Sequence, residues 1–180
     1  RGSIGAANTL FRAGDGAIVA TNTDAAGFFS PLADIPLADA SVVVVGAGGA
    51  ARAVLFALAR AGVGQVTILN RNVLKASALL AAFGLKGRAL PLDARLPAAS
   101  LLVNASALGM TGQPPLELDL APLTPDAIVY DCVYAPLQTD LLSAAEARGL
   151  VTVDGLEMLV GQAAIAFELL FGAAPPRERD

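Results

Sequence analysis

The feature that most constrains the fold is a run of four valines that ends directly in a glycine-rich loop. The segment SVVVVGAG at 41–48 predicts a buried strand, and AARAVLFALARAG at 50–62 predicts a helix closed by its glycine. Gly46, Gly48 and Ala51 then occupy the G-x-G-x-x-G/A positions of a dinucleotide-binding loop. Because the pattern lies between a strand and a helix, it predicts nucleotide binding. The alternative is a glycine turn that serves packing alone.

Apolar runs of strand length alternate with helical stretches in the rest of the chain. The predicted strands lie at 65–70, 88–92, 100–105, 127–134 and 150–154, and the predicted helices at 73–84, 139–149 and 156–172. Such alternation is typical of the α/β class and predicts a Rossmann-like, doubly wound parallel sheet. Residues 7–24 differ, because they predict two short strands around an Asp-Gly turn, followed by a short helix at 25–33.

The residue types that the chain lacks narrow its chemistry. It has no histidine, which excludes Ser-His-Asp triads, Cys-His pairs and histidine-ligated metal sites, and we expect no metal. A net charge of −4 without a basic run argues against nucleic acid as a partner. Charged and polar residues interrupt every long apolar segment, and the single Cys132 excludes an internal disulfide. We therefore expect a soluble cytoplasmic protein that does not enter a membrane.

The polar turn after the strand at 65–70 predicts which dinucleotide is bound. An acidic residue there would bind the ribose 2′-OH of NAD and repel a 2′-phosphate, but this chain has Asn70 followed by Arg71. A guanidinium can hold a phosphate through two hydrogen bonds, and Lys75 lies one helical turn further on. The charges therefore predict NADP(H). The alternative is an exposed basic turn without a ligand.

Seven short motifs occur in an order that resembles the shikimate dehydrogenase family. They are GAANTL (5–10), NTDAAGF (22–28), GAGGAARA (46–53), NRN (70–72), NASALGM (104–110), YDCVY (130–134) and DGLEMLVGQ (154–162). The resemblance covers nearly the whole chain. It implies NADP-dependent reduction of 3-dehydroshikimate to shikimate, in aromatic amino acid biosynthesis, with these small molecules as the binding partners.

The resemblance also implies roles for individual residues. Asp24 would be half of a catalytic Lys–Asp pair, and the substrate would contact Asn8, Thr23, Asp24, Tyr134 and Gln162. The cofactor phosphates would lie against Gly46, Ala47, Gly48, Gly49, Ala50, Asn70, Arg71, Asn72 and Lys75. The remaining cofactor contacts would be Asn104, Ala105, Met110, Cys132 and Gly155.

Several of these residues also have a purely structural interpretation. Asp24 could cap a helix, Asn8 could be a turn residue, and Gln162 could face solvent. Asn104 and Tyr134 could be structural residues at strand ends.

Three departures from the family pattern qualify the resemblance. Ala25 follows NTD where the family has glycine, and Asn72 and Lys75 replace the Thr and Arg of NRTxxR, which softens the preference for NADP. In the family, the catalytic lysine lies in a substrate domain that precedes these motifs. The two lysines here, Lys75 and Lys86, lie in the wrong places to replace it.

These departures lead to a predicted division of the chain. Residues 1–24 would be a remnant of the substrate domain, 25–154 the NADP-binding domain, and 155–180 a terminal helix that returns to the substrate domain. We expect this chain to bind NADP(H) without turnover, and to self-associate through apolar surface of the hairpin and the last helix. Two alternatives stay open: a quinate/shikimate dehydrogenase that uses NAD, and a non-catalytic NADP-binding module.

Overall fold

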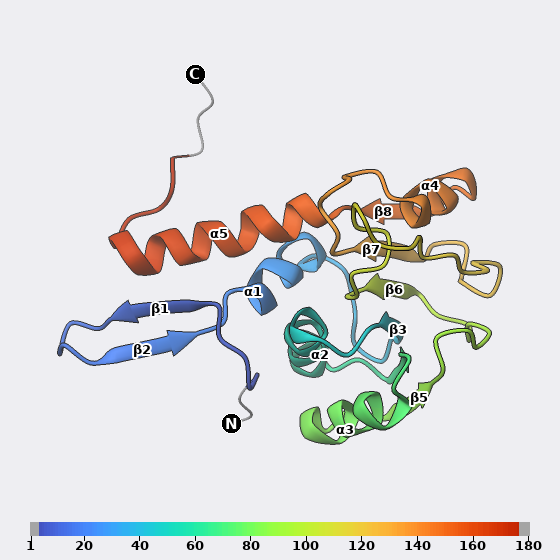
Figure 1. Cartoon of the computed structure of the whole chain (residues 1–180), viewed down its shortest axis with the longest axis horizontal. Coiled ribbons are helices and arrows are strands. Elements are labelled where there is room, and N and C mark those ends of the chain that lie inside the picture. The colour runs from blue at the N-terminus through green and yellow to red at the C-terminus, as the bar shows by residue number, and fades with distance from the viewer. Residues whose placement is uncertain (1–3, 177–180) are drawn as a thin grey trace.

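The computed structural model describes residues 4–176, which form a six-stranded parallel sheet and a separate hairpin (Figure 1). The sheet has the order β5-β4-β3-β6-β7-β8. Its strands are β3 (Ser41–Val45), β4 (Gln65–Leu69), β5 (Gly87–Leu90), β6 (Leu101–Asn104), β7 (Ile128–Asp131) and β8 (Val151–Val153). The chain extends the sheet outward from β3 first on one side and then on the other, so β3 and β6 meet at the topological switch point. The predicted doubly wound α/β fold is confirmed.

The valine run of β3 supplies apolar side chains to two cores, one on each face of the sheet. Val42 and Val44 pack with α1 (Asp24–Phe29), α2 (Gly49–Ala61), α3 (Val73–Phe83) and α5 (Gly155–Phe171). Val43 and Val45 pack on the opposite face with α4 (Asp140–Ala147) and with apolar residues of the two long loops that flank β6. Because successive side chains of a strand point to opposite faces, only an uninterrupted apolar run can serve both cores.

Local sequence fixes where the long helices begin and end. The side chain of Asn72 accepts a hydrogen bond from the Lys75 amide at the start of α3, and Asp154 accepts from the Leu156 amide at the start of α5. The predicted glycine stop of α2 is confirmed, because Gly62 follows it with φ 73°, a left-handed conformation that favours glycine.

The first strands form the predicted hairpin. Strands β1 (Thr9–Arg12) and β2 (Ile18–Thr21) pair antiparallel, and the carboxylate of Asp15 accepts a hydrogen bond from the Ala17 amide in the turn. Figure 1 shows the hairpin lying beside the far half of α5, away from the parallel sheet. It is a separate two-stranded sheet, as its different sequence pattern predicted.

Helices α1 and α5 cross at a pair of glycines. A Cβ on Gly27 would lie 2.6 Å from the Gln162 amide nitrogen, and a Cβ on Gly161 would lie 3.0 Å from the Gly27 Cα. This close approach brings the start of α1 next to Gln162, although the two segments are far apart in the sequence.

The predicted element boundaries were wrong by a few residues at several ends. The strands expected at 41–48 and 127–134 end at Val45 and Asp131, because the glycine loop begins after the first and the neighbouring strands stop pairing beyond the second. The helix expected at 25–33 is divided into α1 and a 3₁₀ turn at Ser30–Leu32, where Pro31 lacks the N–H needed to continue the α-helical pattern.

Candidate active site

The glycine loop joins β3 to α2 with the backbone shape that a pyrophosphate needs. Gly46 has φ 106°, and a Cβ there would lie 2.9 Å from the carbonyl oxygen of Ala105. A Cβ on Gly48, by contrast, would meet no atom within 4 Å, so open space lies above this backbone. Helix α2 starts at Gly49, and the first amides of a helix have no partner within it. These N–H groups and the helix dipole favour an anion at this point.

A cleft of about 610 Å³ opens beside this loop, at the carboxyl ends of the strands. Seven of the predicted cofactor residues line it, namely Gly46, Ala47, Gly48, Asn70, Arg71, Lys75 and Ala105. Gly49 and Ala50 open α2 directly behind the loop. The cleft therefore joins the predicted phosphate site and the predicted cation site in one continuous space.

Two cations lie at one end of the cleft without a partner of opposite charge. Arg71 and Lys75 both line it, and among residues 4–176 neither forms an ion pair. The side chain of Asn70 donates to the Asn72 carbonyl at 2.8 Å, which orders the turn that carries Arg71. No carboxylate lines the cleft within the described residues, although Asp93 and Glu117 line an adjoining hollow that shares Arg71. This end is suited to a doubly charged phosphate.

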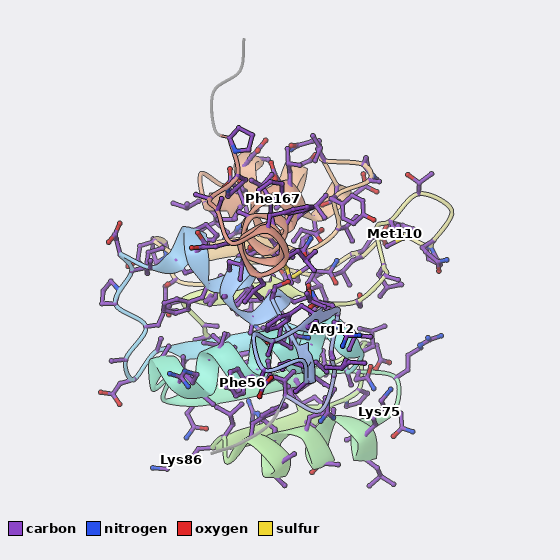
Figure 2. The ribbon with its side chains drawn as sticks, turned by 90° about the vertical axis from the view of Figure 1, so that its left-hand side faces the viewer. Arg12, Phe56, Lys75, Lys86, Met110 and Phe167 are labelled. Atoms are coloured by element: carbon purple, nitrogen blue, oxygen red, sulfur yellow. The ribbon has the colours of Figure 1, made fainter. Side chains whose placement is uncertain are left out.

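The opposite wall of the cleft is the loop after β6, whose shape depends on Asn104. This residue is fully buried, and its Nδ2 donates to the Leu108 carbonyl at 2.9 Å. Its Oδ1 accepts from the Ser106 amide at 3.1 Å and from the Ser106 hydroxyl at 2.7 Å. Asn104 therefore faces away from the cleft and orders the segment that lines it. Met110 also lies outside the cleft lining, at the outer edge of the molecule (Figure 2).

Four of the predicted substrate residues form one polar cluster. The Nδ2 of Asn8 donates to the Asp24 carboxylate at 2.7 Å and to the Thr23 hydroxyl at 3.0 Å, while its Oδ1 accepts from the Thr23 amide at 2.9 Å. The Thr23 hydroxyl donates to Gln162 Oε1 at 3.1 Å. Asp24 is the first residue of α1 and Thr23 is the N-cap, so the helix-cap interpretation of Asp24 was wrong.

The end of β7 lies between this cluster and the cofactor cleft. Cys132 donates its amide to the Asn104 carbonyl at 2.9 Å, and burial, together with the charges of Asp131 and Asp24, raises the pKa of its thiol. A Cβ on Gly155 would lie 2.4 Å from the Val133 carbonyl oxygen, so only glycine allows α5 to start here. Tyr134 is half exposed, and its hydroxyl has no hydrogen-bond partner among residues 4–176.

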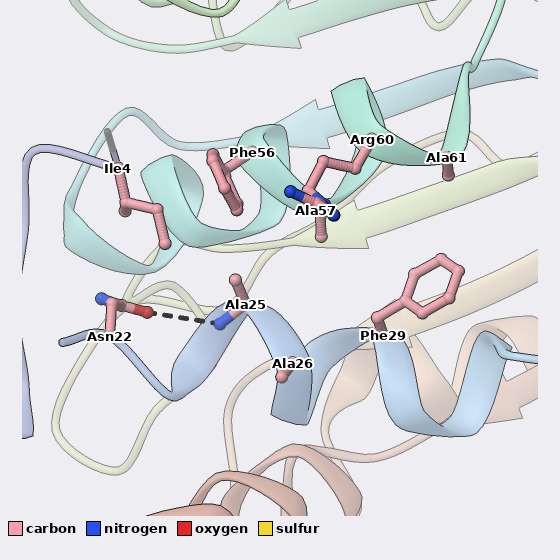
Figure 3. A pocket seen from close by; sticks show the side chains of 9 residues that line it. All are labelled: Ile4, Asn22, Ala25, Ala26, Phe29, Phe56, Ala57, Arg60 and Ala61. Atoms are coloured by element: carbon pink, nitrogen blue, oxygen red, sulfur yellow. Dashed lines mark hydrogen bonds between the residues drawn. The ribbon is translucent and has the colours of Figure 1, made fainter. Parts of the chain in front are cut away.

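A second hollow, of about 400 Å³, lies between α1 and α2 and does not suit a nucleotide (Figure 3). Apolar residues line most of it. Of its polar residues, Asn22 bonds internally to the Ala25 amide and the Ala6 carbonyl, and the Arg60 guanidinium lies over the Phe56 ring. It therefore lacks the free amides that the glycine loop offers.

Two other kinds of site, a metal centre and a membrane span, are absent from the described residues. Across residues 4–176, no cluster of three or more Cys, Asp or Glu residues has the geometry to hold a metal ion. In the same range, no helix is long and apolar enough to cross a membrane.

Asp131 and Thr139 are linked by hydrogen bonds to Asn104, behind the loop after β6, and neither was predicted. The fully buried Asp131 carboxylate accepts hydrogen bonds from Asn104, Val133 and Thr139. Burial raises the pKa of this carboxyl group, and the hydrogen bonds from Val133, Thr139 and Asn104 partly oppose that rise. The signal in the sequence was a single Asp inside the largely apolar strand predicted at 127–134.

Comparison with protein families and curated relatives gives a consistent result. The family described as "Shikimate / quinate 5-dehydrogenase" matches residues 32–107, and "Shikimate 5'-dehydrogenase C-terminal domain" matches residues 155–179. A shikimate dehydrogenase (NADP(+)) of Sphingopyxis alaskensis is 70% identical over all of this chain, which spans 66% of that relative. One of Methylobacterium radiotolerans is 49% identical over 99% of this chain and 67% of the relative.

Solved structures of similar fold include a shikimate dehydrogenase and a reductase named for another substrate. The shikimate 5-dehydrogenase of Thermus thermophilus, in complex with NADP(H) and shikimate, aligns with a TM-score of 0.81 and 42% identity over 96% of this chain and 65% of its own. The ligand-free 5-ketofructose reductase of Gluconobacter sp. strain CHM43 aligns with a TM-score of 0.86 and 34% identity over the same shares. The chain thus spans about two thirds of the proteins it matches.

Proposed function

The chain belongs to the shikimate dehydrogenase family, and from that premise we propose that it is the NADP(H)-binding part of an enzyme that reduces 3-dehydroshikimate to shikimate. The observation that carries the proposal is that the glycine loop, Arg71 and Lys75 line one cleft in which no described carboxylate opposes a phosphate. The names of the relatives supply the substrate class.

The residues of the cleft offer groups that suit the phosphates of the cofactor. Arg71 and Lys75 would hold the adenosine 2′-phosphate, and the amides at the start of α2 would hold the pyrophosphate. The space above Gly48 lets the phosphates approach the backbone closely. The remaining half of the cofactor would then lie along the loop after β6, toward Cys132 and Gly155.

In the reaction, bound NADPH supplies the hydride, and the polar cluster of Asn8, Thr23, Asp24 and Gln162 holds the substrate. Asn8 donates to Oδ1 of Asp24, which leaves Oδ2 free to accept from a substrate hydroxyl or a lysine ammonium. Gln162 and Thr23 are fixed to each other and can donate or accept at neighbouring hydroxyls. The proton for the new hydroxyl would come from the lysine that Asp24 orients.

Neither of the two lysines of the chain lies beside Asp24. Lys75 lies in the first turn of α3 and Lys86 lies just beyond the end of that helix (Figure 2), and Asp24 forms no ion pair within residues 4–176. We therefore propose that the polypeptide of these 180 residues binds NADP(H) without turnover. We also retain the division into a substrate-domain segment (1–24), a cofactor domain (25–154) and a returning helix (155–180) as part of the proposal.

A matched pair of assays tests the function. The 180-residue chain should give negligible shikimate-dependent reduction of NADP⁺, followed by the absorbance of NADPH. The same chain joined to the preceding third of its Sphingopyxis relative should give turnover that the substitution Asp24→Asn abolishes. Normal turnover by the 180 residues alone would contradict the role of the missing lysine. An active fusion that is indifferent to Asp24→Asn would contradict the role of Asp24.

The hairpin and α5 present apolar side chains that the described residues do not cover. Ile18 is 74% exposed on the hairpin, and Phe171 is 69% exposed at the end of α5. Exposed apolar surface of this kind favours association. We propose that the chain by itself self-associates through these two elements, and sedimentation velocity should detect species larger than a monomer. Monomeric behaviour at all concentrations would contradict this.

A further inference from the structure

Asp131 is a buried carboxylate that joins three separate segments of the chain. Its Oδ1 accepts from Asn104 Nδ2 at 2.9 Å and from the Val133 amide at 3.0 Å, and its Oδ2 accepts from the Thr139 hydroxyl at 2.8 Å. Its side chain is inaccessible to solvent, and no cation among residues 4–176 pairs with it. A buried charge without a counter-ion is unfavourable unless its hydrogen bonds are complete, and here three donors surround it.

Through its hydrogen bond to Asn104, Asp131 helps to order a loop that lines the cofactor cleft. Asn104 also bonds to the Leu108 carbonyl and to Ser106, and the Ser106 hydroxyl accepts from the Leu108 amide at 3.2 Å. These bonds define the path of the backbone from Ala105 to Leu108, which forms one wall of the cleft. Without Asp131, the Asn104 amide would lose the partner that fixes its orientation.

The bond to the Val133 amide acts on the other side of the same region. It fixes the turn after β7, where the Val133 carbonyl oxygen lies so close to Gly155 that only glycine fits. The backbone of Cys132 is held between these two contacts and bonds to the Asn104 carbonyl. A single carboxylate therefore bonds to the turn after β7 and, through Asn104, to the loop after β6, and that loop lines the cleft.

We propose that Asp131 is a positioning residue that pre-orders the nicotinamide end of the cofactor cleft, and that it has no part in the adenosine end. This proposal rests on the proposed NADP(H) site. Within the described chain, Arg71, Lys75 and the glycine loop make no hydrogen bond with the Asp131 or Asn104 side chains, although Leu108 lines the same hollows as Arg71. A ligand without the nicotinamide half therefore tests whether the two ends are independent. A preformed wall reduces the ordering that binding would otherwise require.

Two ligands distinguish the ends: NADPH, which spans the cleft, and 2′,5′-ADP, which contains only the adenosine phosphates. The Asp131→Ala variant should have an affinity for NADPH at least about tenfold lower than the wild type, since the acceptor of three hydrogen bonds is lost. Its affinity for 2′,5′-ADP should stay within about twofold of the wild type. Asp131→Asn should restore NADPH affinity. Its Oδ1 can still accept from Asn104 and Val133, and its Nδ2 can donate to the Thr139 hydroxyl.

Milder variants keep the test decisive if Asp131→Ala does not fold. Ser106→Ala removes one bond within the loop and should weaken NADPH about threefold with no change for 2′,5′-ADP. Thr139→Ser is the matched control, because it keeps both the donor to Asp131 Oδ2 and the acceptor for the Leu142 amide, and it should leave both affinities unchanged. Equal loss of both ligands in folded Asp131→Ala or Ser106→Ala, or no loss of either, would overturn the proposal. Failure of the wild type to bind either ligand would instead overturn the proposed function.

Discussion

The two ends of the proposed NADP(H) cleft, called the adenosine end and the nicotinamide end, are built in opposite ways. At the adenosine end, exposed Arg71 and Lys75 have no ion-pair partner among the described residues and are held only by the turn beneath them. At the nicotinamide end, Asn104 and Asp131 are fully buried, and their hydrogen bonds are completed by the protein itself.

This difference separates recognition by charge from recognition by shape. Exposed cations keep their side-chain freedom until the phosphate arrives, and dissolved salt screens them. A buried network has its entropy cost met on folding and is insensitive to salt, but it tolerates few substitutions. We expect variants at the adenosine end to alter which dinucleotide binds, and variants at the nicotinamide end to alter how well any dinucleotide is held.

The largest effects should come from the glycine loop, where both ends meet. Gly48→Ala adds a methyl group in open space, so the fold should persist. The methyl group would hold the phosphates away from the backbone amides and lower NADP⁺ affinity at least about tenfold per bond lost.

Gly46→Ala is the matched contrast, because its Cβ would clash with the Ala105 carbonyl at positive φ. It should also lower the unfolding free energy by about 1–3 kcal/mol. Calorimetry and urea unfolding measure the two effects. Unimpaired NADP⁺ binding by Gly48→Ala would refute the phosphate assignment.

The next effect concerns the exposed cations. Arg71→Gln should weaken NADP⁺ about tenfold and leave NAD⁺ within about twofold, because only NADP⁺ carries the 2′-phosphate. Lys75→Gln should have the same selectivity with a loss of about threefold, as expected for a single exposed charge. In titrations at low and at high salt, the difference in NADP⁺ affinity between the wild type and each variant should be smaller at high salt, because salt screens exposed charges. Equal losses for both dinucleotides would place Arg71 elsewhere on the cofactor.

A pH dependence tests the buried end. Burial raises the pKa of Asp131 above its ordinary value of 3.8, so the folded state holds this proton more tightly than the unfolded state. The contribution of this group to stability is therefore greatest at low pH and falls as pH rises from about 3.8 through the raised pKa. The Asp131→Asn variant has no carboxyl group at this position, so this fall in stability with rising pH should be absent from it. Urea unfolding from about pH 4 to pH 7 should show the variant gaining stability relative to the wild type. Parallel pH profiles would contradict the assignment.

The smallest expected effect is on stability, from a change at the Tyr130 hydroxyl, a buried group that is not part of the Asp131 network. The Tyr130 hydroxyl is buried without a hydrogen-bond partner among residues 4–176, and its ring stacks on Phe28 with the centroids 4.9 Å apart. Tyr130→Phe keeps the ring and should raise the unfolding free energy by up to about 1 kcal/mol. A loss of stability would mean that the hydroxyl has a partner in solution. NADP⁺ affinity should stay unchanged, in contrast to Asp131→Ala.

The residues proposed for the adenosine end could be identified from the sequence because they are close together in the chain. The glycine spacing, the loss of the acid at Asn70 and the one-turn offset from Arg71 to Lys75 are all visible within one short stretch of chain, from Gly46 to Lys75. The nicotinamide end could not be found this way. Its bonds join Asn104 to Asp131 across 27 positions, and Asp131 to Thr139 across 8. These contacts depend on which strands lie next to each other in the sheet. The periodicity of apolar residues in the sequence does not predict that order.

The substrate cluster lies between these cases. The bond between Thr23 and Gln162 spans 139 positions and depends on the glycine crossing of α1 and α5. Only the family resemblance suggested that these residues would meet. The limits of strands and helices were the weakest predictions, because pairing partners and proline, rather than apolar patterns, decide where each element ends.

The measurement that tests the central claim most directly is the affinity of the 180-residue chain for NADP⁺ and for NAD⁺ by titration calorimetry. Binding of NADP⁺ at least about tenfold tighter than NAD⁺, with the difference lost in Arg71→Gln, is the predicted result. Equal affinity for both dinucleotides, or tighter binding of NAD⁺, would contradict the account of this cleft as an NADP(H) site.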